Sequence, residues 1–229
     1  MLSLAMGWRH LLFDNYPVEP EIVDAHLPDA LDVDTFDGDA WLSVVPFTNV
    51  DVRPRGVPEG WGMPLPELNL RTYVTCDDEP GVYFFSLDAQ GVLGVTGARL
   101  FQHLPYYYAR ISLEGVDGKV RFLSRRLHPG ARPAEYEATY WPSGEAFEAH
   151  EDPLARFLLE RYRFYTEAPD GTVRYSNVDH EPWTLYPAGV DERTNTLFAA
   201  DGFDAPDTEP VRYYSPGVDV TASRSKTWD

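Results

Sequence analysis

The sequence has 229 residues, 43% of them hydrophobic, and a formal net charge of −18. This length and apolar fraction are typical of a globular domain with a sizeable core, and no apolar run approaches the ~18 residues of a membrane span. The charge argues against nucleic acid and anionic membranes as partners, because their phosphates would repel the chain.

The acidic residues are scattered through the predicted loops, and Lys119 and Lys226 are the only lysines beside abundant arginine. This pattern resembles proteins of salt-accumulating archaea, in which molar salt shortens the Debye length to ~3 Å and screens self-repulsion. We therefore expect an acidic, halophilic protein that loses structure at low salt. A melting curve that stays the same from dilute buffer to molar KCl would contradict this expectation.

The N-terminal stretch MLSLAMGWRHLLF lacks the features of a signal peptide. Arg9 and His10 interrupt its apolar part, no basic region precedes that part, and no small-residue cleavage site follows. We therefore predict a cytoplasmic protein. Cys76 is the only cysteine, so an internal disulfide and a cysteine-based zinc site are excluded, and its apolar surroundings indicate a buried side chain.

Turn signals at short intervals separate runs rich in Val, Tyr, Phe, Thr and Trp, which predict strands joined by tight antiparallel connections. Helices are predicted over 20–26, over about 90–103, and from Pro153 onward, with Asp152 as N-cap and an apolar stripe reaching Tyr165. The predicted strands lie near 32–36, 40–52, 69–76, 81–88, 106–115, 119–127, 134–141, 172–179, 183–188, 196–199 and 210–221.

No repeat or linker divides the chain, so we expect one domain over residues 1–229. Many strands with few helices indicate a mainly β fold, closed or nearly closed into an antiparallel barrel.

Polar residues mark one face of the predicted strand PELNLRTYV. Glu67, Asn69 and Arg71 share a face in the alternation, and Leu68 and Leu70 share the other. A wet outer face is one interpretation. The following run VYFFSL is apolar on both faces, which indicates a covered neighbour and favours a binding constellation inside the barrel. Both interpretations stay open at this point.

Three consecutive tyrosines begin the strand near 106–115. Tyr106 and Tyr108 share a face with Arg110, whereas Tyr107 is predicted to be a core residue. Arg99 lies just before this strand. Arginines can hold a carboxylate or form structural ion pairs, and tyrosine hydroxyls with a pKa near ~10 act as neutral donors or simply line a wall.

Among the histidines, His180 in DHEPW and then His103 are the candidates for a site, although an ordinary hydrogen-bonded histidine is the simpler interpretation. The sequence contains no HxH or HExxH pattern, nucleophile elbow, phosphate-binding loop or dinucleotide fingerprint. We therefore predict no metal and no cofactor.

Several stretches in consistent order resemble the YqjF-like family, an uncharacterised group with a domain of unknown function. The stretches are GWRHLLFDNYPVEPEIVDAHLP, DGDAWLSVVPF, PELNLRTYV, PGVYFFSLDA, ARLFQHLPYYYARI, LLERYRFY and HEPW. That family is similar in fold to acetoacetate decarboxylase, which implies a cone-shaped antiparallel barrel around a small pocket.

The resemblance also bears on chemistry. Acetoacetate decarboxylases carry a Pro-Lys-Lys stretch whose first lysine forms a Schiff base and whose second lowers its pKa. Here LPYYY stands in that place, with Tyr106 at the nucleophile position, and Glu67 matches an acidic position near the pocket. The resemblance thus implies the pocket without Schiff-base chemistry.

Three functions remain open on this basis. The first is binding of a small carboxylate or oxygen-rich metabolite by Glu67, Asn69, Arg71, Arg99, Tyr106, Tyr108 and His180. The second is acid–base catalysis on a keto or lactone substrate in the same pocket. The third is a non-catalytic interaction protein, and homo-oligomers are compatible with all three. Fold alone does not choose among them.

Overall fold

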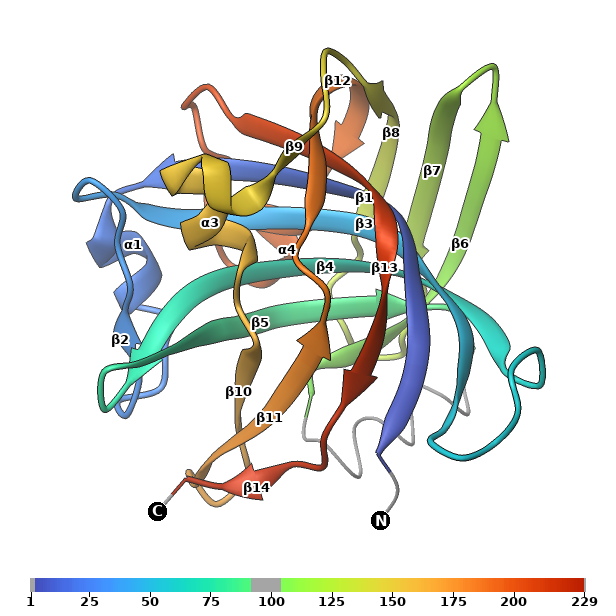
Figure 1. Cartoon of the computed structure of the whole chain (residues 1–229). Coiled ribbons are helices and arrows are strands. Elements are labelled where there is room, and N and C mark those ends of the chain that lie inside the picture. Colours follow the sequence, from blue (N-terminus) through green and yellow to red (C-terminus); the bar gives the residue numbers. More distant parts are fainter. Residues whose placement is uncertain (1–2, 92–103, 229) are drawn as a thin grey trace.

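Strands dominate the chain (Figure 1), and the computed structural model describes residues 3–91 and 104–228. The helices are α1 (Pro20–Asp24), the 3-10 turn η1 (Ala149–Glu151), α3 (Pro153–Leu159) and α4 (Leu197–Asp201), and within the described residues no helix has the length and apolar character to cross a membrane. The strands are β1 (Leu4–Val18), β2 (Asp32–Val33), β3 (Ala40–Pro54), β4 (Met63–Cys76), β5 (Glu79–Ala89), β6 (Tyr106–Val116), β7 (Lys119–Arg126), β8 (Glu135–Pro142), β9 (Phe147–Glu148), β10 (Arg163–Glu167), β11 (Val173–His180), β12 (Thr184–Asn195), β13 (Val211–Ala222) and β14 (Lys226–Thr227).

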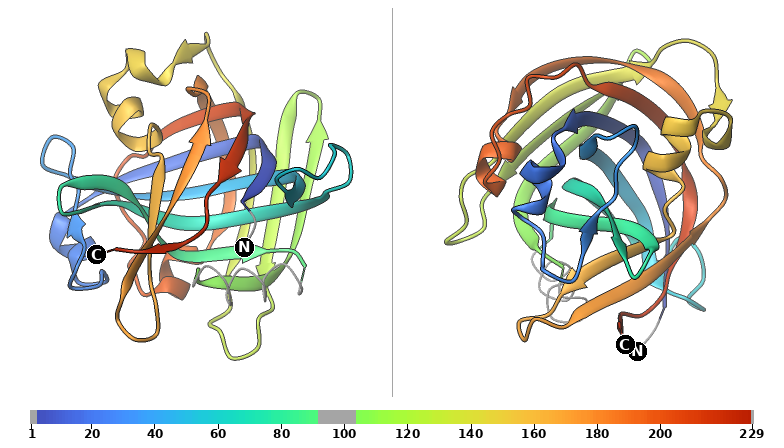
Figure 2. Two further views of the ribbon diagram at one scale, coloured as in Figure 1. Left: turned by 60° about the horizontal axis from the view of Figure 1, so that its bottom comes forward. Right: turned by 90° about the vertical axis from the view of Figure 1, so that its left-hand side faces the viewer.

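The strands close into two rings that share a wall of β13, β1, β3, β4 and β5. In the smaller ring, β10 and β11 join β5 to β13. In the larger ring, β6, β7, β8 and β12 make the same connection. The right panel of Figure 2 shows the wall, blue to green, between the outer arc of the larger ring and the β10–β11 hairpin. The chain therefore has the mainly β, barrel-like architecture with few helices that the sequence predicted.

Each ring encloses its own apolar core, because the shared wall presents alternate side chains to opposite sides. Leu68 and Leu70 of β4 pack inside the larger ring with residues such as Phe122 and Tyr140. Tyr73 of β4 packs inside the smaller ring together with residues of α3 and β10. The apolar run of β5 serves both cores, since Phe84 faces the smaller ring and Phe85 the larger.

A β-bulge in the shared wall changes which ring some side chains of β5 face. The pairing of β4 with β5 shifts register where Leu70 and Arg71 face Ser86 and Phe84, so that Phe85 is an extra residue. A bulge of this kind reverses the alternation. Phe84 and Leu87 consequently both face the smaller ring, although they are an odd number of residues apart.

Several sequence predictions of local structure are confirmed and others are wrong. The start of α3 is as predicted, with the Asp152 side chain accepting a hydrogen bond from the Ala155 amide at 2.8 Å. The helix ends at Leu159, however, and the continuation of its apolar stripe forms β10. Residues 196–199, predicted as a strand, begin α4 instead. The long strand β1 was not predicted, and the helix predicted over about 90–103 lies almost wholly outside the described residues.

Candidate functional site

The smaller ring contains a cavity of about 430 Å³. This volume is in the range of pockets that hold small organic molecules. Its walls are mainly apolar and come from β1, β3, β4, β5, β10 and β11, with the end of α3 and the segment that follows β13. The apolar lining residues are Leu4, Met6, Trp8, Phe47, Val52, Leu65, Val82, Phe84, Leu87, Ala89, Leu104, Leu159, Phe164, Val178, Trp183 and Ala222.

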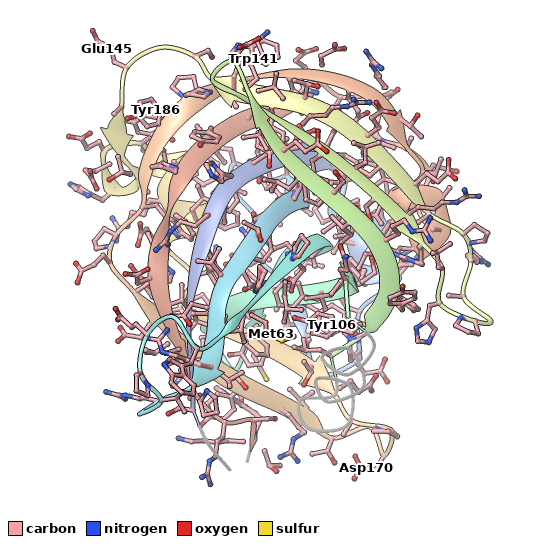
Figure 3. All side chains as sticks on the ribbon, turned by 90° about the vertical axis from the view of Figure 1, so that its right-hand side faces the viewer. Met63, Tyr106, Trp141, Glu145, Asp170 and Tyr186 are labelled. Atoms are coloured by element: carbon pink, nitrogen blue, oxygen red, sulfur yellow. The ribbon has the colours of Figure 1, made fainter. Side chains whose placement is uncertain are left out.

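Glu67 and Tyr106 meet on this cavity. The Tyr106 hydroxyl donates a hydrogen bond of 2.8 Å to Glu67 Oε2. The contact forms because Tyr106 begins β6, which pairs in parallel with the end of β5, and this part of β5 pairs with the start of β4. Figure 3 shows Tyr106 near the lower end of β6, below the centre of this view and far from Trp141 at its top. The structure therefore brings together Glu67 and Tyr106, both of which the sequence analysis named as candidates.

Burial controls the electrostatics of this pair. Glu67 is only 6% exposed, and desolvation raises its pKa to about 7. Hydrogen bonds from Tyr106, Asn69 and Asn49 act in the opposite direction but do not offset the burial. The pKa of Tyr106 is raised well above its ordinary value by desolvation and by the Glu67 charge. Tyr106 is thus a neutral donor, whereas Glu67 can gain or lose a proton near neutral pH.

Arg71 is the arginine of the cavity lining that, among the described residues, is neither exposed nor joined to an acidic partner. Its Nε atom is buried without a hydrogen-bond partner, and its guanidinium carbon lies 5.5 Å from the centre of the Phe13 ring and 5.7 Å from that of Tyr73. The other two arginines near the ring interior are paired. Arg161 contacts Asp34 at 2.7 Å, and Arg163 contacts Glu79 at 3.2 Å.

His180 lies at another part of the cavity lining, within an aromatic cluster. Its ring centre is 4.7 Å from that of Tyr162 and 4.9 Å from that of Trp183, and its Nδ1 atom is 2.8 Å from the Glu181 carbonyl oxygen. In the described part of the chain, no group of three or more His, Cys, Asp and Glu side chains could hold a metal ion.

The structure gathers some of the predicted site residues and separates others. Glu67, Arg71, Tyr106 and His180 line the cavity. Asn69 is buried beside Glu67 without lining the cavity. Tyr108 is not among the lining residues, and its amide donates to His128 Nδ1 at 3.1 Å. Arg99 and His103 lie outside the described residues.

The sequence analysis missed several polar lining residues, among them Asn49, Arg161 and Arg163. Asn49 donates to Glu67 Oε2 at 3.4 Å. Its position near the end of the apolar run WLSVVPFTNV was a usable signal, because an amide in a covered strand requires a partner. The two arginines gave no such signal, because the stretch that holds them continues the helical stripe of α3.

Both lysines of the sequence lie away from the cavity. Lys119 is exposed at the start of β7, with its amino nitrogen 3.9 Å from the centre of the Trp141 ring. Lys226 is exposed in β14, with its amino nitrogen 5.9 Å from the centre of the Tyr175 ring. Neither amine is placed to react with a molecule bound beside Glu67 and Tyr106.

Comparison with known sequences identifies relatives of the whole chain. Residues 5–219 match the family model DUF2071, described as an uncharacterized conserved protein. The uncharacterized protein YqjF of Bacillus subtilis (strain 168) is 39% identical over 222 residues, which cover 96% of this chain and 90% of that protein.

Solved structures with the same fold are distant in sequence. The acetoacetate decarboxylase of Legionella pneumophila superposes with a TM-score of 0.68 at 13% identity, covering 99% of this chain and 87% of that one. The enduracididine biosynthesis enzyme MppR with bound HEPES gives 0.70 at 12%, covering 99% and 88%. Its complex with pyruvate gives 0.68 at 11%, covering 98% and 90%. At these identities the likeness shows the fold alone.

Proposed function

We propose that this chain, which belongs to the DUF2071 family of uncharacterized conserved proteins, binds a small organic carboxylate in the cavity of its acetoacetate decarboxylase-like barrel, without a Schiff-base lysine. Arg71 holds the carboxylate, and the apolar walls contact the rest of the molecule. The position of both lysines outside the cavity supports a non-covalent mode of binding.

The observation that carries this proposal is the unpaired charge of Arg71. A guanidinium taken out of water costs several kcal/mol unless an anion and hydrogen bonds compensate it. Arg161 and Arg163 have such partners, whereas Arg71 has none among the described residues and leaves Nε without an acceptor. The planar fork of a guanidinium matches a carboxylate in two parallel hydrogen bonds. A carboxylate ligand would therefore serve as the missing counterion.

The cavity itself favours a ligand over an interaction protein with a filled interior. Such a protein would pack its own side chains between Arg71 and Tyr106. Both residues instead line a cavity of about 430 Å³, and a cavity with apolar walls and a few converging polar groups is the usual form of a small-molecule site.

The substitution Arg71→Gln tests this proposal. Hydrogen bonds to charged groups contribute roughly 1.5–3 kcal/mol, so we expect carboxylate binding to weaken by about 10- to 100-fold. The ligand-free variant should melt no lower than the wild type, because the substitution removes no ion pair. Titration calorimetry with pyruvate, 4-oxopentanoate and 5-oxohexanoate, and with their methyl esters, measures the affinity and its dependence on the carboxylate.

The matched control is Arg121→Gln, which removes an exposed arginine of β7 that pairs with Glu137. This variant should bind the acids as the wild type does. Equal affinity in wild type and Arg71→Gln, or equal binding of acids and esters, would show that Arg71 does not hold a carboxylate.

A further inference from the structure

The acidic group and the unpaired arginine of the cavity lie on one face of the same strand. Glu67 and Arg71 are four residues apart in β4, so their Cα atoms are separated by roughly 13 Å. They form no ion pair with each other. The Arg71 guanidinium carbon lies 5.5 Å from the centre of the Phe13 ring and 5.7 Å from that of the Tyr73 ring. Apolar side chains such as Phe84 and Leu87 complete the wall between these two positions.

The geometry around Glu67 is that of a positioned base. Tyr106 and Asn49 both donate to Oε2, at 2.8 and 3.4 Å, which fixes the orientation of the carboxyl group. The group lines the cavity yet is only 6% exposed, so bulk water does not compete for it. A carboxyl group with a pKa of about 7 exchanges protons readily at neutral pH.

We propose that Glu67 transfers a proton to and from the carbon next to the carbonyl group of an oxo acid whose carboxylate is held by Arg71. This inference rests on the proposed function, because Arg71 must anchor the acid for the carbonyl end to reach Glu67. It assigns a class of substrate and an activity to the cavity, with no amine intermediate.

The step balances within the protein and its substrate. The C–H bond breaks, its proton passes to a Glu67 oxygen, and the electron pair of that bond delocalises onto the carbonyl oxygen as an enolate. While Glu67 is ionised, the Tyr106 hydroxyl donates to it. Once Glu67 carries the proton, that hydroxyl donates to the enolate oxygen instead. The reverse step returns a proton from Glu67 to carbon, after exchange with solvent.

The experiment is hydrogen–deuterium exchange of oxo acids in deuterium oxide, followed by NMR of the protons next to the ketone. The probes are 4-oxopentanoate, 5-oxohexanoate, 6-oxoheptanoate and 7-oxooctanoate, which place the ketone at increasing distance from the carboxylate. We expect exchange to depend on chain length with an optimum, and Glu67→Gln to slow it by at least about 100-fold. Titration of the same acids should give a Kd for Glu67→Gln within a few-fold of the wild type.

Two matched variants and one chemical control complete the design. Glu137→Gln removes a carboxylate of β8, and Tyr186→Phe removes a hydroxyl of β12; neither residue lines the cavity. Both variants should exchange as the wild type does, whereas Tyr106→Phe should slow exchange about tenfold. Borohydride added with the best oxo acid should leave no covalent adduct.

The outcomes separate this inference from the proposed function. Binding of the acids without exchange overturns the proton transfer and leaves the carboxylate site standing. Equal exchange by wild type and Glu67→Gln, or a reduced adduct on Lys119 or Lys226, also overturns it. If the acids neither bind nor exchange, both proposals fall together.

Discussion

Replacing Arg126 by methionine should lower the free energy of unfolding by about 3–5 kcal/mol at neutral pH. Arg126 of β7 donates from Nε to Asp88 Oδ1 at 2.7 Å and from Nη1 to Asp201 Oδ1 at 3.1 Å. The three side chains are at most 5% exposed. The substitution would leave two carboxyl groups buried without their cation, and this desolvation is the main cost.

Urea denaturation of the wild type and Arg126→Met at several pH values measures this effect. The loss should shrink toward pH 5, because protonation of Asp88 and Asp201 removes the uncompensated charge. Desolvation already raises the pKa of Asp88 to about 7 and raises that of Asp201. The control Arg121→Met removes an arginine that is 47% exposed and should cost less than about 1 kcal/mol. Similar losses of unfolding free energy in the two variants would mean that the buried cluster stabilises the fold no more than an exposed ion pair does.

Glu67→Gln should stabilise the ligand-free protein at pH 8 by about 2 kcal/mol. The pKa of Glu67 is about 7 in the folded chain against 4.5 as the ordinary value. The folded state therefore holds a proton that the unfolded state has lost between these pH values. Stability consequently falls as the pH rises from 4.5 to 7, by up to ~3 kcal/mol at about 1.4 kcal/mol per unit. Glutamine removes this penalty and gives up about 1 kcal/mol of hydrogen bonding.

The same variant should show no stabilisation near pH 4.5, where Glu67 is protonated in the folded state and about half protonated in the unfolded state, so that the burial of its charge costs little. Other buried acids, Asp88 among them, titrate in the wild type and the variant alike, so the difference between the two curves isolates Glu67. Glu137→Gln is the control, with a curve parallel to that of the wild type. A constant difference between Glu67→Gln and wild type across pH 4.5–8 would be evidence against a raised pKa.

The parts of the fold that the sequence predicted are those where the side-chain pattern is local and regular. Strand β4 alternates cleanly, so Glu67 and Arg71 were assigned to one face, and both line the cavity. Strand β1 lacks such alternation. His10 has a positive φ of 57°, and the pairing shifts register between Arg9 and Asp14. Trp8 and Phe13 therefore face the same core despite their odd spacing. The sequence of β1 consequently lacks the regular alternation of apolar and polar residues by which a strand is recognised.

Two other errors have simple physical causes. The stripe of α3 continues past Leu159 at helical spacing, but Phe164 and Tyr165 are consecutive buried residues of β10 that face different clusters. The short run TLFA, residues 196–199, was predicted as a strand and begins α4 instead. The useful signal there was Gly202, which ends the helix in the left-handed conformation with φ of 96°.

The candidate site was predictable in part. The family resemblance implied that Glu67 and Tyr106 lie at the same pocket, although it did not imply the hydrogen bond between them. The Asp88–Arg126–Asp201 cluster did not, because it joins β5, β7 and α4 across separations of 38 and 75 residues. The unpaired state of Arg71 was also beyond the sequence, since a structural ion pair was an equally good expectation until the contacts of its guanidinium were known.

The most direct measurement of the central claim is the position of a bound carboxylate in crystals grown with 5-oxohexanoate. Our account predicts electron density inside the smaller ring, with the carboxylate oxygens within about 3 Å of the Arg71 guanidinium nitrogens. Density for the acid elsewhere on the protein, or a smaller ring closed around its own side chains without ligand, would contradict it.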